Sequence, residues 1–215
     1  MRVAALPGVF RPRPDTWMLA AHLRAQLRPR TSLLDVCTGS GALAIAGAQA
    51  GAGAVTAIDV SRRSVLTVRL NARLNGVRVR ALRGDLFEPV AGERFDAIVS
   101  NPPYLPAADD ELPRRGQRRA WDAGTDGRVL LDRICEQAPA HLNPGGFVLL
   151  VHSSICGLEP TVELLEAGGL RVDVLERSRG RLGPLVSARA PLLEARGILA
   201  PGEREEDMLI VKAAA

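Results

Sequence analysis

Short apolar runs alternate along this chain with segments of helical periodicity, and this alternation constrains the fold more than any other feature. The runs span 32–37, 54–59, 77–82, 95–100, 147–151, 170–176 and 208–211. They are apolar on both faces, which is typical of strands in a parallel sheet that is covered on both sides. Helical spacing recurs at 15–28, 42–50, 61–75, 127–142 and 159–167. The sequence therefore predicts an α/β fold with a seven-stranded, mostly parallel sheet and helices on both faces.

The C-terminal part of the chain departs from this alternation. No helix is predicted between the last two strands, so we expect them to form an antiparallel hairpin. The segment 178–206, with its glycines, prolines and arginines, predicts no regular structure. No linker divides the 215 residues. We expect one domain over 1–215, with an N-terminal extension and helix at 1–30 and the core at 31–215.

Composition narrows the class of protein. The formal net charge is +4, the pI is near 9.6 and Lys212 is the only lysine, so arginine carries the positive charge. This balance fits either a compositional bias of the genome or an acidic partner such as RNA. The three cysteines, Cys37, Cys135 and Cys156, lie far apart, which indicates neither a zinc site nor a disulfide framework. We expect no metal site, no signal peptide, no membrane span and a reduced cytoplasmic location.

A glycine turn follows the first predicted strand. The strand ends at Cys37 and runs into Thr38-Gly39-Ser40-Gly41, and a helix of small residues starts at once. Strand, glycine turn and helix in succession form a nucleotide-type loop, because backbone N–H groups are exposed where a ligand can approach closely. Asp59 ends the next strand, where a ribose-binding acid belongs. This pattern alone is equally typical of an NAD enzyme.

Two further acids favour a different cofactor. Asp35 lies at the end of the first strand and Asp85 follows the third. Acids at three successive strand ends suit a ligand that has an adenosine and a separate ammonium group, whereas Asp35 would repel a pyrophosphate. S-adenosylmethionine fits this description, with Asp35 at the methionine part, Asp59 at the ribose and Asp85 at the adenine. The alternative is that Asp35 merely orders the loop and Asp85 forms a turn.

The strand at 95–100 ends in Asn101-Pro102-Pro103-Tyr104. Neither proline can donate to a strand ladder, so the strand stops and presents a stiff polar tip. An amide oxygen, a backbone carbonyl and an aromatic ring can together hold a planar amino group. We expect the Asn101 side-chain oxygen and the Pro102 carbonyl to accept its two N–H groups while Tyr104 stacks on its plane. The tip therefore predicts the acceptor site of a methyltransferase.

These motifs, taken in order, resemble the class I methyltransferases of the HemK (PrmC) type, which methylate glutamine in peptide-chain release factors. Segments 10–16 and 121–128 resemble those that flank the core in the short eukaryotic and archaeal branch. The resemblance implies a Rossmann-like class I fold and S-adenosylmethionine as cofactor, with S-adenosylhomocysteine as product. One departure is that Cys37 replaces the first glycine of the usual loop pattern.

The predicted site has three sets of residues. The catalytic residues are Asn101, Pro102 and Tyr104. The cofactor-binding residues are Thr16, Asp35, Cys37, Thr38, Gly39, Gly41, Asp59, Val60, Asp85, Leu86 and Asn101. The substrate-binding residues are Pro103, Tyr104, Trp121 and Gly124. The role of Thr16 at the methionine end is implied by the resemblance.

Two rival functions stay open. The same tip would serve an N-methyltransferase of adenine or guanine in RNA or DNA, and Arg114-Arg115 and Arg118-Arg119 in the following loop would suit one. A cofactor-binding module without catalysis is the second rival. The resemblance also implies a protein substrate and, in the short branch, a small zinc-binding activator subunit at the sheet edge.

Overall fold

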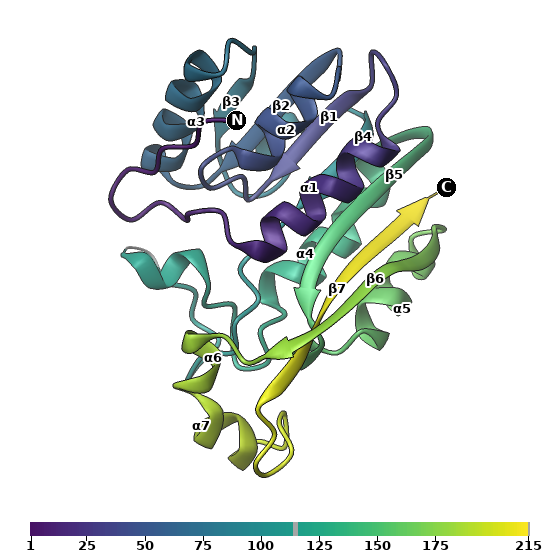
Figure 1. Ribbon diagram of the computed structural model, residues 1–215. Coiled ribbons are helices and arrows are strands. Elements are labelled where there is room, and N and C mark those ends of the chain that lie inside the picture. The colour runs from purple at the N-terminus through teal and green to yellow at the C-terminus, as the bar shows by residue number, and fades with distance from the viewer. Residues whose placement is uncertain (114–115, 215) are drawn as a thin grey trace.

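The computed structural model describes residues 1–113 and 116–214 and shows one seven-stranded sheet (Figure 1). The strands are β1 (Ser32–Val36), β2 (Ala54–Asp59), β3 (Arg80–Arg83), β4 (Phe95–Ser100), β5 (Leu142–Ser153), β6 (Arg171–Arg181) and β7 (Glu205–Ala214). Their order is β3-β2-β1-β4-β5-β7-β6, and β7 alone runs antiparallel to its neighbours β5 and β6. The predicted fold class is confirmed.

Helices cover both faces of the sheet. They are α1 (Pro14–Gln26), α2 (Ala42–Gln49), α3 (Arg62–Leu74), α4 (Val129–Gln137), α5 (Glu159–Ala167), α6 (Pro184–Ser187) and α7 (Ala190–Ala195). In β1, Leu33 packs with α1 and α2, whereas the next residue, Leu34, packs with α4 on the opposite face. Since both faces are buried, strands such as β1 need apolar side chains at successive positions. No helix in the described part of the chain is long and apolar enough to span a membrane.

Three boundaries differ from the prediction. The helix expected over 127–142 ends at Gln137 and continues as the 3-10 helix η3 (Ala138–His141), because Pro139 has no N–H for another α-helical bond. The turn expected at 143–146 lies inside β5, where the pairing jumps from Phe95–Leu142 to Ala97–Phe147. The third predicted strand also starts later, at Arg80.

The C-terminal hairpin is longer than predicted. β6 and β7 pair from Arg171–Ala214 to Arg181–Glu205. The expectation of no helix between them was wrong, because α6 and α7 occupy the connection. Most of β6 is exposed, so its sequence lacks the apolar run that marks a buried strand. The hairpin carries α6 and α7 beyond the carboxyl end of β5 (Figure 1).

A third apolar cluster ties this hairpin to the long loop that follows the acceptor tip. Its buried members are Leu105, Leu182, Val186, Ala190, Leu193 and Leu199, with Trp121 packed against them. The loop closes on itself through a bridge between Leu105 and Asp122. Arg189 donates to the buried Asp122 carboxylate at 2.6 Å and to the Pro106 carbonyl at 2.6 Å. The segment 178–206 is therefore an ordered wall beside the loop.

Candidate cofactor and acceptor site

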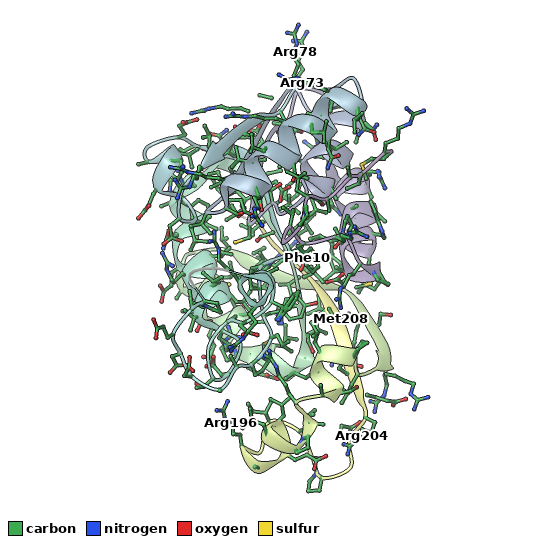
Figure 2. The ribbon with its side chains drawn as sticks, turned by 90° about the vertical axis from the view of Figure 1, so that its left-hand side faces the viewer. Phe10, Arg73, Arg78, Arg196, Arg204 and Met208 are labelled. Atoms are coloured by element: carbon green, nitrogen blue, oxygen red, sulfur yellow. The ribbon has the colours of Figure 1, made fainter. Side chains whose placement is uncertain are left out.

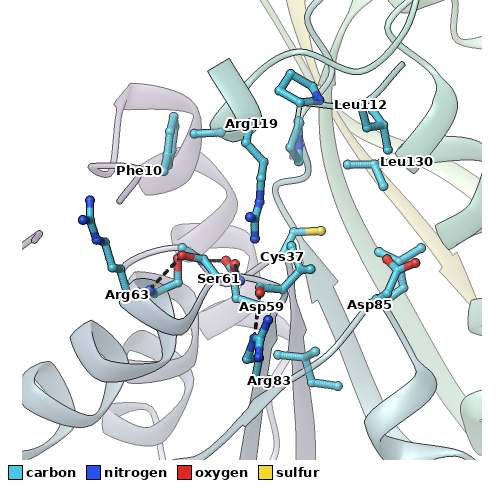
Figure 3. Close-up of a pocket in the computed structure, with 18 of the residues that line it drawn as sticks. Phe10, Cys37, Asp59, Ser61, Arg63, Arg83, Asp85, Leu112, Arg119 and Leu130 are labelled. Carbon is cyan, nitrogen blue, oxygen red and sulfur yellow. Dashed lines mark hydrogen bonds between the residues drawn. The ribbon is translucent and has the colours of Figure 1, made fainter. Parts of the chain in front are cut away.

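A cavity of about 870 Å³ opens at the carboxyl ends of β1, β2 and β4 (Figure 3). Of the predicted residues, Cys37, Gly39, Asp59, Val60, Asp85, Leu86, Asn101 and Pro103 line it. A small adjoining pocket is lined by Thr16, Cys37, Thr38 and Asn101 among others. Asp35, Gly41, Pro102, Tyr104, Trp121 and Gly124 line neither space. The structure thus brings Asp59, Asp85 and Asn101 together at one cavity, whereas Asp35 does not line it.

The glycine turn has the backbone that such a loop requires. Gly39 and Gly41 have φ values of 55° and 83°, in the left-handed region that disfavours side chains. A Cβ on Gly41 would also lie 3.0 Å from the Val68 side chain. Cys37 adopts φ 58° as well, which explains why a glycine suits this position in the related pattern.

Asp59 joins the turn to the start of α3. Its Oδ2 accepts the Gly39 N–H at 2.9 Å and its Oδ1 accepts the Ser61 N–H at 2.8 Å. Ser61 in turn caps α3 by accepting the Ser64 N–H. Burial raises the pKa of Asp59 above its usual range. Each carboxylate oxygen keeps a further lone pair, so Asp59 retains the capacity to accept from ribose hydroxyls.

Asp35 lies behind the turn and not on the cavity wall. Its Oδ2 accepts the Thr38 hydroxyl at 2.5 Å and the Ala44 N–H at 3.0 Å. Its Oδ1 is buried and has no hydrogen-bond partner within the described residues. Burial raises the pKa of Asp35 to about 7. The contact between Asp35 and the methionine ammonium stays a prediction.

Asp85 has a partner that the sequence did not reveal. Arg133 of α4 donates to its Oδ2 at 2.7 Å, and both side chains are partly exposed at the cavity. The next residue, Leu86, is buried with φ 44°. A carboxylate can accept from an arginine and from one more donor, so Asp85 can still accept from an adenine amino group. The adenine contacts of Asp85 and of the Leu86 backbone stay predictions.

The acceptor tip is anchored from two sides. The Ser100 hydroxyl donates to the Val36 carbonyl at 2.7 Å, which joins the ends of β4 and β1. The Asn101 Nδ2 donates to Asp15 Oδ2 at 3.0 Å and to Thr16 Oγ1 at 3.1 Å. Both amide hydrogens are thereby engaged with α1, and the Asn101 Oδ1 is the atom left to accept.

The remaining predicted substrate residues have structural contacts. Tyr104 packs against the core, and its hydroxyl donates to Asp15. Trp121 packs on the α6–α7 cluster. A Cβ on Gly124 would lie 2.4 Å from the Val129 side chain, and the Gly124 carbonyl accepts the Ala107 N–H. Contacts of these residues with a substrate stay predictions.

Several residues of the site were missed from the sequence. Asp15 and Phe10 belong to the 10–16 segment that carries the resemblance, but neither was assigned to the site. The Phe10 Cβ lies 3.3 Å from the place that a Cβ on Gly39 would take. Arg119, from the 3-10 helix η2 (Gln117–Ala120), reaches toward Asp59 (Figure 3). Arg133 was the fourth. The sequence suggested Arg119 only as a contact for nucleic acid, and nothing in it pointed to Arg133.

The cysteines should be unreactive in the folded protein. Burial raises the pKa of Cys135 and Cys156 to about 12, and burial with the Asp59 and Asp35 charges raises the pKa of Cys37 further. At pH 8 the thiolate, which is the reactive form, is therefore scarce. We expect iodoacetamide to label the folded chain slowly and the urea-unfolded chain at all three positions, as counted by mass spectrometry. Rapid labelling of folded Cys37 would contradict this.

The cavity wall fits S-adenosylmethionine. Two features of this structure fit: a glycine turn without Cβ atoms along the wall, and carboxylates at the ends of β2 and β3 that suit a ribose and an amino group. Asp59 and the Gly39 backbone would hold the ribose side, and Asp85 and Leu86 the adenine side. When bound, this cofactor supplies an electrophilic methyl group on a sulfonium.

Comparison with known proteins identifies the family of this chain. Residues 1–113 match the model of the methyltransferase small domain family. A protein of Methanocaldococcus jannaschii, provisionally named protein N5-glutamine methyltransferase, is 35% identical over 80% of this chain and 85% of its own length. The release factor glutamine methyltransferase of Geobacter sulfurreducens is 37% identical over 67% of this chain, which spans 53% of that enzyme.

Solved structures show the same fold. The Mtq2–Trm112 complex of E. cuniculi, described as responsible for methylation of the termination factor eRF1, matches with a TM-score of 0.64 at 19% identity, over 96% of this chain and 98% of that one. The T. thermophilus 16S rRNA N2 G1207 methyltransferase RsmC, bound to AdoMet and guanosine, matches with a TM-score of 0.64 at 24% identity, over 98% and 46%. By family model and by sequence identity, this chain belongs to the S-adenosylmethionine-dependent methyltransferases of the methyltransferase small domain family, alongside the glutamine methyltransferases.

Proposed function

We propose that this chain methylates the side-chain amide nitrogen of a glutamine in a protein, with a peptide-chain release factor as the substrate. The observation that carries the proposal is the Asn101 amide, whose hydrogens are held by Asp15 and Thr16 at the rim of the cofactor cavity. The names of the relatives from M. jannaschii and G. sulfurreducens support the same acceptor.

The residues of the tip account for the chemistry. A primary amide nitrogen is a poor nucleophile because its lone pair is delocalised into the carbonyl. The Asn101 Oδ1 and the Pro102 carbonyl would accept its two N–H groups, aim the nitrogen into the cavity and stabilise the positive charge that develops on it. Pro102 is buried and Asn101 directly follows β4, which ends at Ser100, so ordered backbone holds both acceptors.

The test is methyl transfer with labelled cofactor. The purified chain should label the release factor of its own organism, and mass spectrometry should place one methyl group on a single glutamine. A release-factor variant with that glutamine replaced by glutamate should stay unlabelled. A cell extract can replace the chosen substrate. If the methyl acceptor in the extract is destroyed by protease and not by nuclease, the acceptor is a protein. If no extract fraction accepts a methyl group, the chain is a binding module and the proposal fails.

An N-methyltransferase of RNA or DNA is the second candidate, because a guanine amino group would suit the same tip and the pI is near 9.6. The arginines do not favour it. Arg118 pairs with the buried Asp122, and Figure 2 shows Arg73 and Arg78 at the opposite end of the molecule from Arg196 and Arg204. The predicted pair at 114–115 lies outside the described residues. Steep loss of acceptor affinity with salt would favour this candidate over a protein acceptor.

We also infer that the small zinc-binding activator subunit implied by the resemblance covers the β3 edge; the solved E. cuniculi structure is likewise a complex of two proteins, Mtq2 and Trm112. On α3, Leu66, Leu70 and Leu74 are 55%, 40% and 46% exposed at a spacing of four residues, which places them on one helical stripe. β3 is the outermost strand of the described sheet. Leu70→Asp should abolish co-purification of a zinc-containing partner, whereas Val174→Asp on the opposite edge should not. Zinc retained by Leu70→Asp would contradict the inference.

A further inference from the structure

The carboxylate of Asp15 is the point where the parts of the acceptor tip meet. Its Oδ2 accepts from Asn101 Nδ2 at 3.0 Å and from the Tyr104 hydroxyl at 2.9 Å. Its Oδ1 accepts the Thr16 N–H at 2.7 Å. Asn101 and Tyr104 are 86 and 89 residues away in sequence. One side chain in the first turn of α1 thus contacts both Asn101 and Tyr104 of the motif that follows β4.

An ionised carboxylate can only accept hydrogen bonds. Asn101 can therefore face Asp15 with its NH₂ group alone, because the opposite orientation would set two oxygens against each other. Thr16 enforces the same direction. Its hydroxyl points to Asp15 Oδ1 at 3.4 Å, so its oxygen is left to accept from Asn101. Both neighbours thus direct the Asn101 oxygen away from α1.

The charge on Asp15 also acts through the amide. A hydrogen bond to a carboxylate polarises the donor, and chains of hydrogen bonds strengthen one another in a low-dielectric site. The N–H bonded to Asp15 shifts electron density toward the Asn101 oxygen. That oxygen becomes a better acceptor for an incoming N–H group and a better partner for positive charge.

We propose that Asp15 is a positioning residue, which fixes the direction of the Asn101 amide and anchors the Tyr104 ring so that the Asn101 oxygen meets the acceptor nitrogen. This inference rests on the proposed function for its kinetic part, whereas its structural part stands without it. Asp15 lines neither the cavity nor the small pocket, so we expect it to make no direct contact with the cofactor.

The kinetic test uses Asp15→Asn, which has the same shape but can donate as well as accept. We expect kcat to fall about 10- to 100-fold, in the range that misplacement of a catalytic group costs, while the Kd for S-adenosylhomocysteine is unchanged. Asp173→Asn, the same change on an exposed strand, should leave both values unchanged. In the Asn101→Ala background, Asp15→Asn should cause a smaller loss than in the wild type, because only the anchoring of Tyr104 is then left to lose. Equal loss of affinity and kcat in Asp15→Asn, or an undiminished loss in the Asn101→Ala background, would overturn the proposal.

A second test needs no activity. Tyr104 is the only tyrosine, so the ultraviolet titration of tyrosinate reports on it alone. Burial raises the pKa of Tyr104 well above 10, and the charge of Asp15 raises it next, with smaller contributions from Glu206 and Cys156. Asp15→Asn should lower the titration midpoint, whereas Asp173→Asn should not move it. An unchanged midpoint would overturn the anchoring of Tyr104.

NMR observes the Asn101 amide itself. Because it is measured at neutral pH, it tests the proposal even if the chain unfolds at the alkaline pH of the tyrosine titration. The Asn101 side-chain amide protons, assigned by their absence in Asn101→Ala, should shift in Asp15→Asn and not in Asp173→Asn. If they do not shift, Asp15 does not orient the amide. A wild-type chain that transfers no methyl group while these protons shift would refute the proposed function and leave the positioning role supported.

Discussion

Asn101→Ala should lower kcat for methyl transfer about 100- to 1,000-fold and leave cofactor affinity nearly unchanged. The substitution removes the acceptor that aims the amide nitrogen and stabilises its developing charge, and loss of one such group costs about 100- to 1,000-fold in kcat. Asn101 lines the cavity, yet Asp59 and the glycine turn, which would hold the cofactor, contact it through no hydrogen bond within the described residues. Single-turnover transfer and calorimetric binding of S-adenosylhomocysteine measure the two quantities separately.

A matched control keeps this result specific. The Asn143 side-chain amide also donates to an aspartate, Asp96 Oδ1, at 2.7 Å, but Asn143 lies near the amino end of β4. Asn143→Ala should therefore cost stability without a change in kcat for the folded fraction. Equal losses of transfer and cofactor affinity in Asn101→Ala would assign Asn101 to cofactor binding and contradict its catalytic role.

The sheet was predictable because burial on both faces leaves a strong mark on a strand. β1 and β4 match their predicted ranges to within a residue. The lengths of β6 and β7 were underestimated because β6 is an exposed edge strand, where polar side chains are tolerated and no apolar run develops. Helices α6 and α7 are too short to show a periodic pattern.

The residues of the site also fall into those that were predictable from the sequence and those that were not. Asp59 and Asn101 were predictable because each ends a parallel strand, and the carboxyl ends of such strands meet at one edge. Asp15, Arg119 and Arg133 approach that edge from helices and from a loop, through contacts that span tens of residues in sequence. Nothing local in the chain distinguishes an arginine that enters a cavity from one on the surface. Tertiary packing alone decides this.

Asp35 makes a second large prediction, this time on stability. Burial raises its pKa from 3.8 to about 7 in the folded protein, so the folded state binds a proton more tightly than the unfolded state does. Between those two values the folded state holds more protons, and stability must fall as pH rises. One pKa unit is worth about 1.4 kcal/mol, so the ionised Asp35 costs roughly 2–4 kcal/mol at pH 8 relative to pH 4.

Asp35→Asn removes this titration, so the variant should gain stability relative to wild type as pH rises from 4 to 8, by about 2–4 kcal/mol in urea unfolding. Asp96→Asn is the control, because hydrogen bonds from Ser32 and Asn143 lower the pKa of Asp96 and confine its effect to pH values below 4.

Cofactor affinity then separates the two roles left open for Asp35. If the carboxylate attracts the methionine ammonium, S-adenosylmethionine should bind the stabilised variant at least tenfold more weakly at pH 8, since a charge interaction of about 1.4 kcal/mol is lost. Unchanged affinity would mean that Asp35, through Thr38 and Ala44, only orders the loop.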